Sequence, residues 1–554
     1  MTEFLFMKGY IKMHLTLFLR IAVLCFCMPW LVSPAIGQSF QSMTFTKDYF
    51  PGTNEINGRA LGSTETMTII KHKGKLFAGM GDWMDYPWET GTEGSQILRK
   101  DAYNTPWVVD TSFGYRSMRT EAVLSVTFTK DLNNTALNPA ANILVCGAGD
   151  ISIDRPREIN IWVRDDNTGM WIKNTAFTVN RGSSGIRSFA MHTDNVTGKQ
   201  WLFAGMVEGS VFKAQYNAGK SGWLVIDTTL ELRGMGRVMA MTECNGDLYA
   251  TAGVDLVGTD TVGGLFRRID GINPSWVQIY RWKYNALDHG DEANIQRGIT
   301  CVPDPVNPAR NVIIGTRANP GVVEIIDPAQ SNAVTIELDI RGFFSTQWNT
   351  PFRGPSLSAY NYFVPDTLNG QKIWWQSLWV EHPQYQTHPY NGSHFLVRYQ
   401  DGTYKYGDIF DNSNPLPNGQ RLRACRTICK SPFAQEPGAY YFGGYDCAND
   451  TSHNTSWIYK GVLSSTSTLN EFMKNGSLPN VIFSINYLSK SIYVNGLGNA
   501  AKSYSIMSVS GQVVQMGQTQ GNRIGIASLN SGMYLIRLNT GKGNTIISKV
   551  HYCP

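Results

Sequence analysis

An arginine recurs at the start of short apolar segments, and this residue type at this spacing could hold an anionic ligand. The segment RTEAV begins at Arg119, and the segment RVMAM begins at Arg237. The clear copies are Arg119, Arg187, Arg237, Arg297 and Arg426, with a weaker copy at Arg353. A guanidinium group presents a planar fork of donors that matches carboxylate, sulfate or phosphate. If they surround one opening, these arginines are a predicted substrate-binding set for an acidic ligand.

Acidic residues follow the second apolar segment of most units, so a structural role for the arginines is also open. These acids are Asp82, Asp150, Glu208, Asp255 and Asp446. A carboxylate of the same or a neighbouring unit could hold each arginine and fix a loop. Both interpretations can apply to different arginines. Trp83 follows the first of these acids, and an aromatic face in such a loop can stack on a sugar ring, so we count it as substrate-binding.

Proton-transfer groups are concentrated in the loops of the last two units. The candidate catalytic residues are His382, His388, His394, His453 and Tyr390. Imidazole titrates near neutral pH and suits general acid and base work. The H-x5-H-x5-H spacing matches no zinc motif, so we expect no metal. Alternatively, these histidines merely form hydrogen bonds in a polar loop.

The arginines return at intervals of about 50 to 70 residues, with a longer gap around the weaker copy, which is typical of a β-propeller. Each unit continues with a second apolar strand such as Leu248–Ala250, then a third, and a fourth often opened by tryptophan. These tryptophans are Trp107, Trp171, Trp223 and Trp276. The fold class is therefore predicted as all-β, a seven-bladed β-propeller over residues 38–470, with six or eight blades as alternatives. A strand near residues 43–46 could complete the last blade.

Strand direction predicts which face of the propeller carries the functional residues. The first strand of each unit runs away from its arginine and the second strand returns. The loop after the second strand must therefore lie on the same face as the arginine. We expect the functional residues to gather on this face.

Composition and the N-terminus indicate an exported protein. Charged residues are only 16% of the chain, and the net charge of +5 resides in the two ends, so we expect no nucleic-acid partner. Residues 1–37 have basic residues, an apolar stretch and the small residues Ala35-Ile36-Gly37, as in a signal peptide. A membrane anchor is the alternative interpretation. No other segment is long enough to be transmembrane, and no cofactor is indicated.

Seven cysteines remain after the predicted signal peptide, and export makes disulfides possible. Cys425 and Cys447 are the best pair, because adjacent antiparallel strands would place them opposite each other. Four others read as small buried strand residues, namely Cys146, Cys244, Cys301 and Cys429.

The C-terminal residues 484–554 form a separate pattern of alternating strands and glycine turns, after a linker at 471–483. They contain SGQVV at 510–514, LNSGMYLIRL at 529–538 and a late KV at 549–550. This pattern of strands and turns by itself predicts a small β-sandwich. It resembles the C-terminal sorting domain (Por) of the type IX secretion system of Bacteroidetes. The resemblance implies outer-membrane secretion and sorting machinery as a partner, and a secreted or surface-anchored product.

Two classes of function fit these features. The first is an enzyme on an anionic polysaccharide, most simply a lyase, because β-elimination needs a cation on the uronate carboxylate, a base and an acid. The second is a non-catalytic surface propeller that binds a glycan or a protein through the same face. No family motif decides between them.

Overall fold

The structure is a computed structural model of the chain, and its described residues fall in two compact units, 1–463 and 464–554. The described residues are 38–40, 43–82, 94–114, 117–150, 156–179, 185–220, 223–233, 236–253, 261–283, 295–318, 320–348, 356–357, 362–380, 393–409, 422, 424–445, 454–463, 482–486, 491–495, 503–508, 512–519, 521–526, 528–529, 532–539 and 545–552. The predicted signal peptide 1–37 and most of the predicted linker 471–483 lie outside them, so these boundaries stay predictions.

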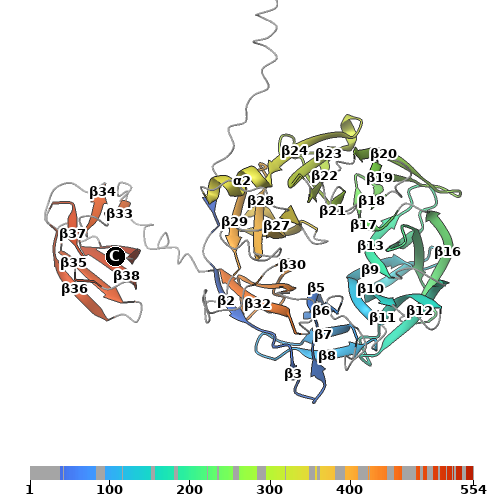
Figure 1. The fold of residues 1–554 in the computed structure, drawn as a ribbon, viewed down its shortest axis with the longest axis horizontal. Helices are drawn as coiled ribbons and strands as arrows, with labels where there is room; N and C mark the ends of the chain where they lie inside the picture. The colour runs from blue at the N-terminus through green and yellow to red at the C-terminus, as the bar shows by residue number, and fades with distance from the viewer. Residues whose placement is uncertain are drawn as a thin grey trace, which may run out of the picture. The chain divides into compact units, whose positions relative to one another are not determined.

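The first unit is built from antiparallel sheets that follow one another in a β-propeller (Figure 1), and we describe its strands in chain order as seven blades, the first two of which share one eight-stranded sheet. The first three blades are β5 (Glu65–His72), β6 (Lys75–Gly81), β7 (Gln96–Lys100) and β8 (Val108–Ser112); β9 (Ser117–Lys130), β10 (Ala136–Asp150), β11 (Arg157–Arg164) and β12 (Trp171–Val179); and β13 (Ile186–Thr193), β14 (Gln200–Met206), β15 (Val211–Tyr216) and β16 (Leu224–Leu232). One backbone bridge, between Gly81 and Arg119, joins the first two blades.

The fourth to seventh blades repeat this order. They are β17 (Val238–Cys244), β18 (Asp247–Gly253), β19 (Thr261–Ile269) and β20 (Ser275–Lys283); β21 (Gln296–Pro303), β22 (Asn311–Arg317), β23 (Val322–Asp327) and β24 (Ala333–Asp339); β26 (Val364–Leu368), β27 (Gln371–Val380), β28 (Ser393–Tyr399) and β29 (Tyr404–Asp408); and β30 (Ala424–Lys430), β31 (Ala439–Tyr445) and β32 (Ser456–Leu463). Smaller elements are β1 (Gln38–Ser39), β3 (Thr53–Asn54), β4 (Ala60–Leu61), η2 (Pro328–Gln330), α2 (Ile340–Gln347) and β25 (Ser356–Leu357).

The last blade takes its fourth strand from the N-terminal part of the chain. Strand β2 (Met43–Lys47) pairs antiparallel with β32, so that Met43 lies opposite Leu463. The innermost strand of this blade, β30, also contacts the innermost strand of the first blade, β5. The predicted contribution of residues 43–46 is therefore confirmed.

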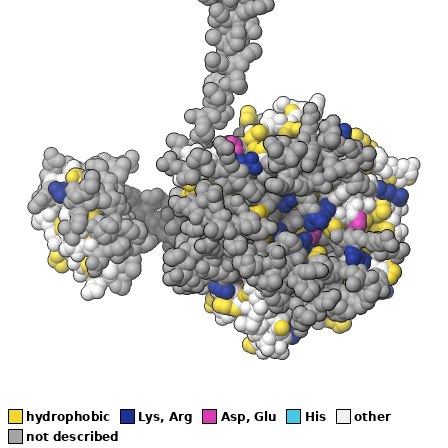
Figure 2. Space-filling view, viewed as in Figure 1, with side chains coloured by type: hydrophobic (Ala, Val, Ile, Leu, Met, Phe, Trp, Pro, Cys, Tyr) yellow, Lys and Arg dark blue, Asp and Glu magenta, His cyan; other side chains and the backbone are white. Residues whose placement is uncertain are grey.

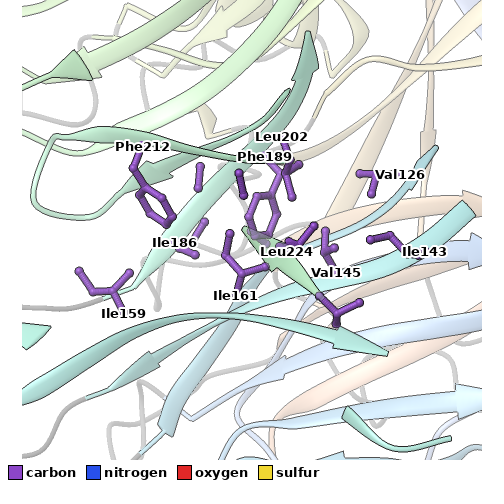
Figure 3. Close-up of a cluster of buried hydrophobic side chains, with 14 of the residues drawn as sticks. Val126, Ile143, Val145, Ile159, Ile161, Ile186, Phe189, Leu202, Phe212 and Leu224 are labelled. Carbon is purple, nitrogen blue, oxygen red and sulfur yellow. The ribbon is translucent and has the colours of Figure 1, made fainter. Parts of the chain in front are cut away.

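Apolar side chains fill the spaces between blades. The second strands are nearly continuous apolar runs because both of their faces are covered, whereas most residues of the outermost strands are half-buried or exposed. Between the second and third blades, Ile161 and Val145 pack with Phe189 and Leu202 (Figure 3). Burying one such side chain stabilises the fold by about 1.5–3 kcal/mol.

A buried cation also joins several neighbouring blades. In four blades it lies near the end of the third strand and pairs with a carboxylate on or next to the outermost strand of the preceding blade. An indole or phenol that opens the fourth strand donates to the same carboxylate. The four groups, which we call inter-blade clamps, are Lys100–Asp48–Trp107, Arg164–Asp110–Trp171, Arg268–Glu231–Trp276 and Arg398–Glu337–Tyr404.

The clamp at Arg268 is the most extensive of the four. Its guanidinium lies 2.7 Å from Glu231 Oε2 and 2.9 Å from Asp194 Oδ2, and all three side chains are almost fully buried. It also pairs with Asp270. Because a charge in a low-dielectric interior is costly without its partner, this cation holds two blades in one relative position.

We expect Arg268→Met to lower the free energy of unfolding by about 3–5 kcal/mol, because it leaves buried carboxylates uncompensated. The neighbouring Arg267 is the matched control, since its side chain is 40% exposed and lies 3.5 Å from Asp247. Arg267→Met should cost less than about 1 kcal/mol. Urea titrations of both variants measure the difference, and equal losses would show that the clamp does not stabilise the fold.

The second unit is a small β-sandwich, as predicted. One sheet holds β33 (Ile482–Asn486), β34 (Ser491–Asn495) and β37 (Arg523–Gly525), and the other holds β35 (Ser503–Ser508), β36 (Val513–Gln518), β38 (Gly532–Asn539) and β39 (Thr545–Tyr552). Ile492 of the first sheet and Ile506 and Ile536 of the second share one core. Within the described part of the chain, no helix is long and apolar enough to cross a membrane.

Candidate functional site

Five of the predicted arginines occupy equivalent places in the propeller. Four lie within the first three residues of an innermost strand, and Arg237 directly precedes β17. Arg119 pairs with Gly149, next to Asp150 at the end of β10, and Arg297 pairs with Thr316 near the end of β22. The arginines and the loops after the second strands therefore lie at the same end of each blade, as the strand directions predicted. We call it the arginine end.

Glutamates on the innermost strands lie between three of these arginines. Glu65 opens β5 at the place where an arginine lies in five other units, and it is fully buried. Its Oε1 lies 3.0 Å from Arg119 Nε, and its Oε2 lies 2.8 Å from Arg426 Nη2. Glu121 Oε1 lies 2.7 Å from Arg119 Nη1, and its Oε2 lies 3.1 Å from Arg187 Nε.

These contacts make a chain of alternating charges across four blades, the seventh, first, second and third, which we call the axial charge chain: Arg426, Glu65, Arg119, Glu121 and Arg187. Burial raises the pKa of Glu121, but the positive charges of Arg187 and Arg119 outweigh burial and hold the pKa below its usual value. Glu121 therefore stays ionised. Figure 2 shows Lys/Arg and Asp/Glu side chains together near the middle of the face in view.

Sequence reasoning missed the two glutamates, because it looked for partners in the loops. Two signals were present. Glu65 heads the first unit, where no arginine precedes the innermost strand. Glu121 comes two residues after Arg119, so the strand period of two places the side chains of Arg119 and Glu121 on one side. Arg297 is buried and Arg237 half-buried.

Several predicted site residues cannot be located. Those that lie outside the described residues are Arg353, Trp83, His382, His388, Tyr390, His453, Asp255 and Asp446. Their roles stay predictions. Cys447 also lies outside, whereas Cys425 is buried with its Sγ 3.5 Å from Thr427 O, so the predicted Cys425–Cys447 disulfide stays a prediction as well.

His394 is the one predicted catalytic histidine that the structure places. It lies on β28 and is buried against the rings of Phe344 and Trp348, at centroid distances of 5.4 and 5.6 Å. Its Nδ1 lies 2.6 Å from Asp408 Oδ1. A carboxylate at one ring nitrogen orients the imidazole, and its Nε2 is buried. The third and fourth strands of the sixth blade, not the innermost one, carry this dyad, because Asp408 is the last residue of β29 and lies opposite His394.

A cavity of about 150 Å³ lies against the innermost strands. Glu121 and Arg187 of the axial charge chain form part of its wall. Tyr362, at the sixth blade, lies on the same wall, and burial raises its pKa to about 12. The wall combines charged and hydroxyl groups with apolar ones, as a binding cavity requires. Among the described residues, no group of three or more His, Cys, Asp or Glu side chains could hold a metal ion.

Glu208 is an acid of unusual character at the arginine end. It lies in the tight turn between β14 and β15, where Gly209 N donates to Met206 O. Both carboxylate oxygens are buried. Burial raises the pKa of Glu208 to about 7, against the opposing attraction of Arg157. A carboxyl group that titrates near neutral pH can give or take a proton under extracellular conditions.

Close backbone contacts place this turn beside Arg237. Val207 N donates to Gly185 O, two residues before Arg187. Gly209 faces Gly236 so closely that a Cβ on Gly209 would lie 2.2 Å from Gly236 O. Gly236 is the residue before Arg237, so only glycine lets the two loops approach this closely. Sequence reasoning noted Glu208 but missed this glycine contact.

The shifted pKa predicts a pH effect on stability. An acid whose pKa is raised from about 4.5 to about 7 stabilises the folded state below pH 4.5, and this contribution is lost as the pH rises through 7. Glu208→Gln should therefore gain on the order of 1–3 kcal/mol relative to the native protein between pH 4.5 and pH 8.5. Thermal unfolding at both pH values measures it. Glu158→Gln, at a surface ion pair with Lys173, is the control and should show little change.

The glycine contact gives a second test. Gly209→Ala must place a Cβ at φ +90° and against Gly236 O, whereas Gly58→Ala meets φ +85° with nothing within 4 Å. Both variants carry the strain of a left-handed backbone, about 1 kcal/mol or more. Only the first also suffers the clash. We expect Gly209→Ala to unfold at a lower urea concentration than Gly58→Ala, and equal midpoints would contradict the close approach.

Comparison with known families identifies the tail. Residues 484–551 match the family described as "Secretion system C-terminal sorting domain". The resemblance seen in the sequence is thus confirmed, and the chain is a β-propeller protein with a type IX sorting domain, directed to the cell surface or the extracellular space. The match covers the tail alone. No curated protein matches the chain.

Three solved structures are distant likenesses of part or most of the chain. The extracellular domain of BT3049 from B. thetaiotaomicron is 13% identical, with a TM-score of 0.40, and the match covers 93% of this chain but only 58% of that one. The α-L-arabinofuranosidase Arb93A from Fusarium graminearum is 10% identical, with a TM-score of 0.33 and coverage of 76% and 98%. The α-L-arabinofuranosidase CtGH43 from Clostridium thermocellum is 9% identical, with a TM-score of 0.28 and coverage of 49% and 93%. At TM-scores of 0.40 and below, these likenesses decide neither the fold nor the activity of this protein.

Proposed function

We propose that this secreted propeller binds an acidic glycan at its arginine end. The observation that carries the proposal is the axial charge chain, in which each buried glutamate lies between two arginines. A carboxylate or sulfate on a ligand has the same chemistry as these glutamates. It would therefore extend the alternation of charges toward the arginines of the fourth and fifth blades.

The innermost strands favour this position for the ligand. Glu121 lies two residues after its arginine, and the equivalent positions after Arg237 and Arg297 carry Met239 and Ile299. The charge of Arg237 also helps to lower the pKa of Glu121, so this arginine lies close to the axial charge chain. The half-buried Arg237, beside the Glu208 turn, is the arginine that we expect to contact the acidic group of the glycan.

Glu208 supports a second candidate, a lyase on a uronate-containing polysaccharide. In β-elimination a base removes the proton at C5, the C4–O bond breaks, and an acid protonates the leaving oxygen. An arginine that neutralises the uronate carboxylate makes the C5 proton more acidic. Glu208, with its pKa near 7, could serve as the proton-transfer group, and the histidines and Tyr390 of the sixth- and seventh-blade loops remain alternatives.

The binding proposal predicts the behaviour of an Arg237→Gln variant. It should retain the thermal stability of the native protein to within a few degrees but lose about 2–5 kcal/mol of binding free energy for a polyuronate. Titration calorimetry with the polyuronate and with its uncharged methyl ester measures this loss. Arg310→Gln, which removes a carboxylate-paired arginine from the loop between β21 and β22 at the opposite end of its blade, should bind like the native protein.

The native protein and the polyuronate also separate the two candidate functions. Formation of the unsaturated product is measured by its absorbance. Retention of the polyuronate without this product identifies a binding protein. Product formation identifies a lyase, and Glu208→Gln should then lower turnover by roughly 10²–10⁴ with little change in affinity. Equal affinity for the polyuronate and its methyl ester, or no affinity for either, would overturn the proposal.

A further inference from the structure

Two cysteines from neighbouring blades meet at the end of the propeller opposite the arginines. Cys244 is the last residue of β17, and Cys301 lies near the end of β21. Their sulfur atoms are 2.6 Å apart, although 57 positions separate them in the sequence. Both strands are the innermost strands of their blades, and they pack against each other. The sequence alone treated each cysteine as a small strand residue.

The backbone around the two sulfurs holds the strands in this position. Asn245 has φ +54° and Gly246 has φ +87° in the tight turn that follows Cys244. Asn245 Nδ2 donates to Asn311 O of the fifth blade at 3.1 Å, so the turn is attached to the same blade that carries Cys301. The contact between the thiols is therefore part of a fixed junction between two blades.

The two thiols differ in environment. The hydrogen bond with Cys301, together with burial, raises the pKa of Cys244, whose side chain is almost fully buried. The hydrogen bond between the two thiols and the backbone N–H of Asn245 lower the pKa of Cys301. The thiolate is the nucleophile of thiol–disulfide exchange, so Cys301 is the sulfur that reacts first.

An oxidant can approach Cys301 from outside. This cysteine is only partly buried and lines a surface pocket of about 520 Å³ with Pro303, Trp374 and Lys430. The sorting domain directs the protein to the cell surface or the extracellular space, and disulfides form and persist in such oxidising surroundings.

We propose that Cys244 and Cys301 form a disulfide that ties the fourth and fifth blades together. The Cys301 thiolate attacks a sulfur of a dithiol–disulfide oxidant and forms a mixed disulfide. Cys244 then loses its proton and attacks the Cys301 sulfur, and the oxidant leaves as its dithiol. In sum the pair gives up two protons and two electrons, and the oxidant's disulfide receives them.

The test is a peptide map of the secreted protein. Free thiols are blocked with N-ethylmaleimide during denaturation, and the protein is digested without reduction. We expect mass spectrometry to find the peptide of Cys244 joined to the peptide of Cys301. In Cys244→Ser, Cys301 should instead carry the blocking group. Cys429→Ser removes a buried cysteine on β30 and should leave the cross-link intact.

A second measurement separates a missing bond from incomplete oxidation. The folded native protein is treated with a disulfide oxidant before mapping, and thermal unfolding is followed with and without reductant. Reduction should lower the melting temperature by roughly 2–5 °C in the native protein, and by less in the double variant Cys244→Ser/Cys301→Ser. Two blocked cysteines after oxidant treatment, or a bond from either cysteine to another residue, would overturn the inference.

Discussion

The buried pairing of a cation with a carboxylate on the neighbouring blade is the interaction on which the rest of this structure depends. Apolar packing between sheets is strong but tolerates sliding, because it has no direction. A buried charge tolerates very little displacement from its partner. The indole or phenol of each inter-blade clamp donates a further hydrogen bond to the carboxylate, which helps to satisfy its oxygens. In the first blade, Lys100 and Trp107 reach Asp48 beside β2, so the clamp also fixes the N-terminal strand.

The two ends of the blades have different tasks as a result. The clamps lie at the ends of the third strands, as Arg164 does at the end of β11. The contact between Cys244 and Cys301 lies at the same end of the blades, where the innermost strands finish. The arginines lie where the innermost strands begin. Structural charges at one end hold the blades at a constant spacing. At the other end, that spacing brings Arg119 within reach of glutamates from two different blades.

The axial charge chain gives part of the arginine repeat a structural role. Arg119, Arg187 and Arg426 contact carboxylates, so the structural interpretation holds for them, and the glutamates that they contact lie on innermost strands and were not among the predicted loop acids. Such pairing does not exclude ligand binding, because an arginine has five donors and one carboxylate uses at most two in a fork. It does mean that a ligand must join an existing network of charges, which makes recognition dependent on the position of every member.

The sequence by itself determined the repeat, the strand order, the face shared by the arginines and the loops, the strand from the N-terminal region and the identity of the tail. These follow from local patterns: the alternation of side chains along each strand, the recurring Arg and Trp residues, and the glycine turns. It did not determine the clamps, the glutamate partners, the raised pKa of Glu208 or the contact of Cys244 with Cys301, because each joins residues of different blades or depends on burial. Only the tertiary structure sets which side chains meet across a blade boundary and how far each carboxyl group is removed from water.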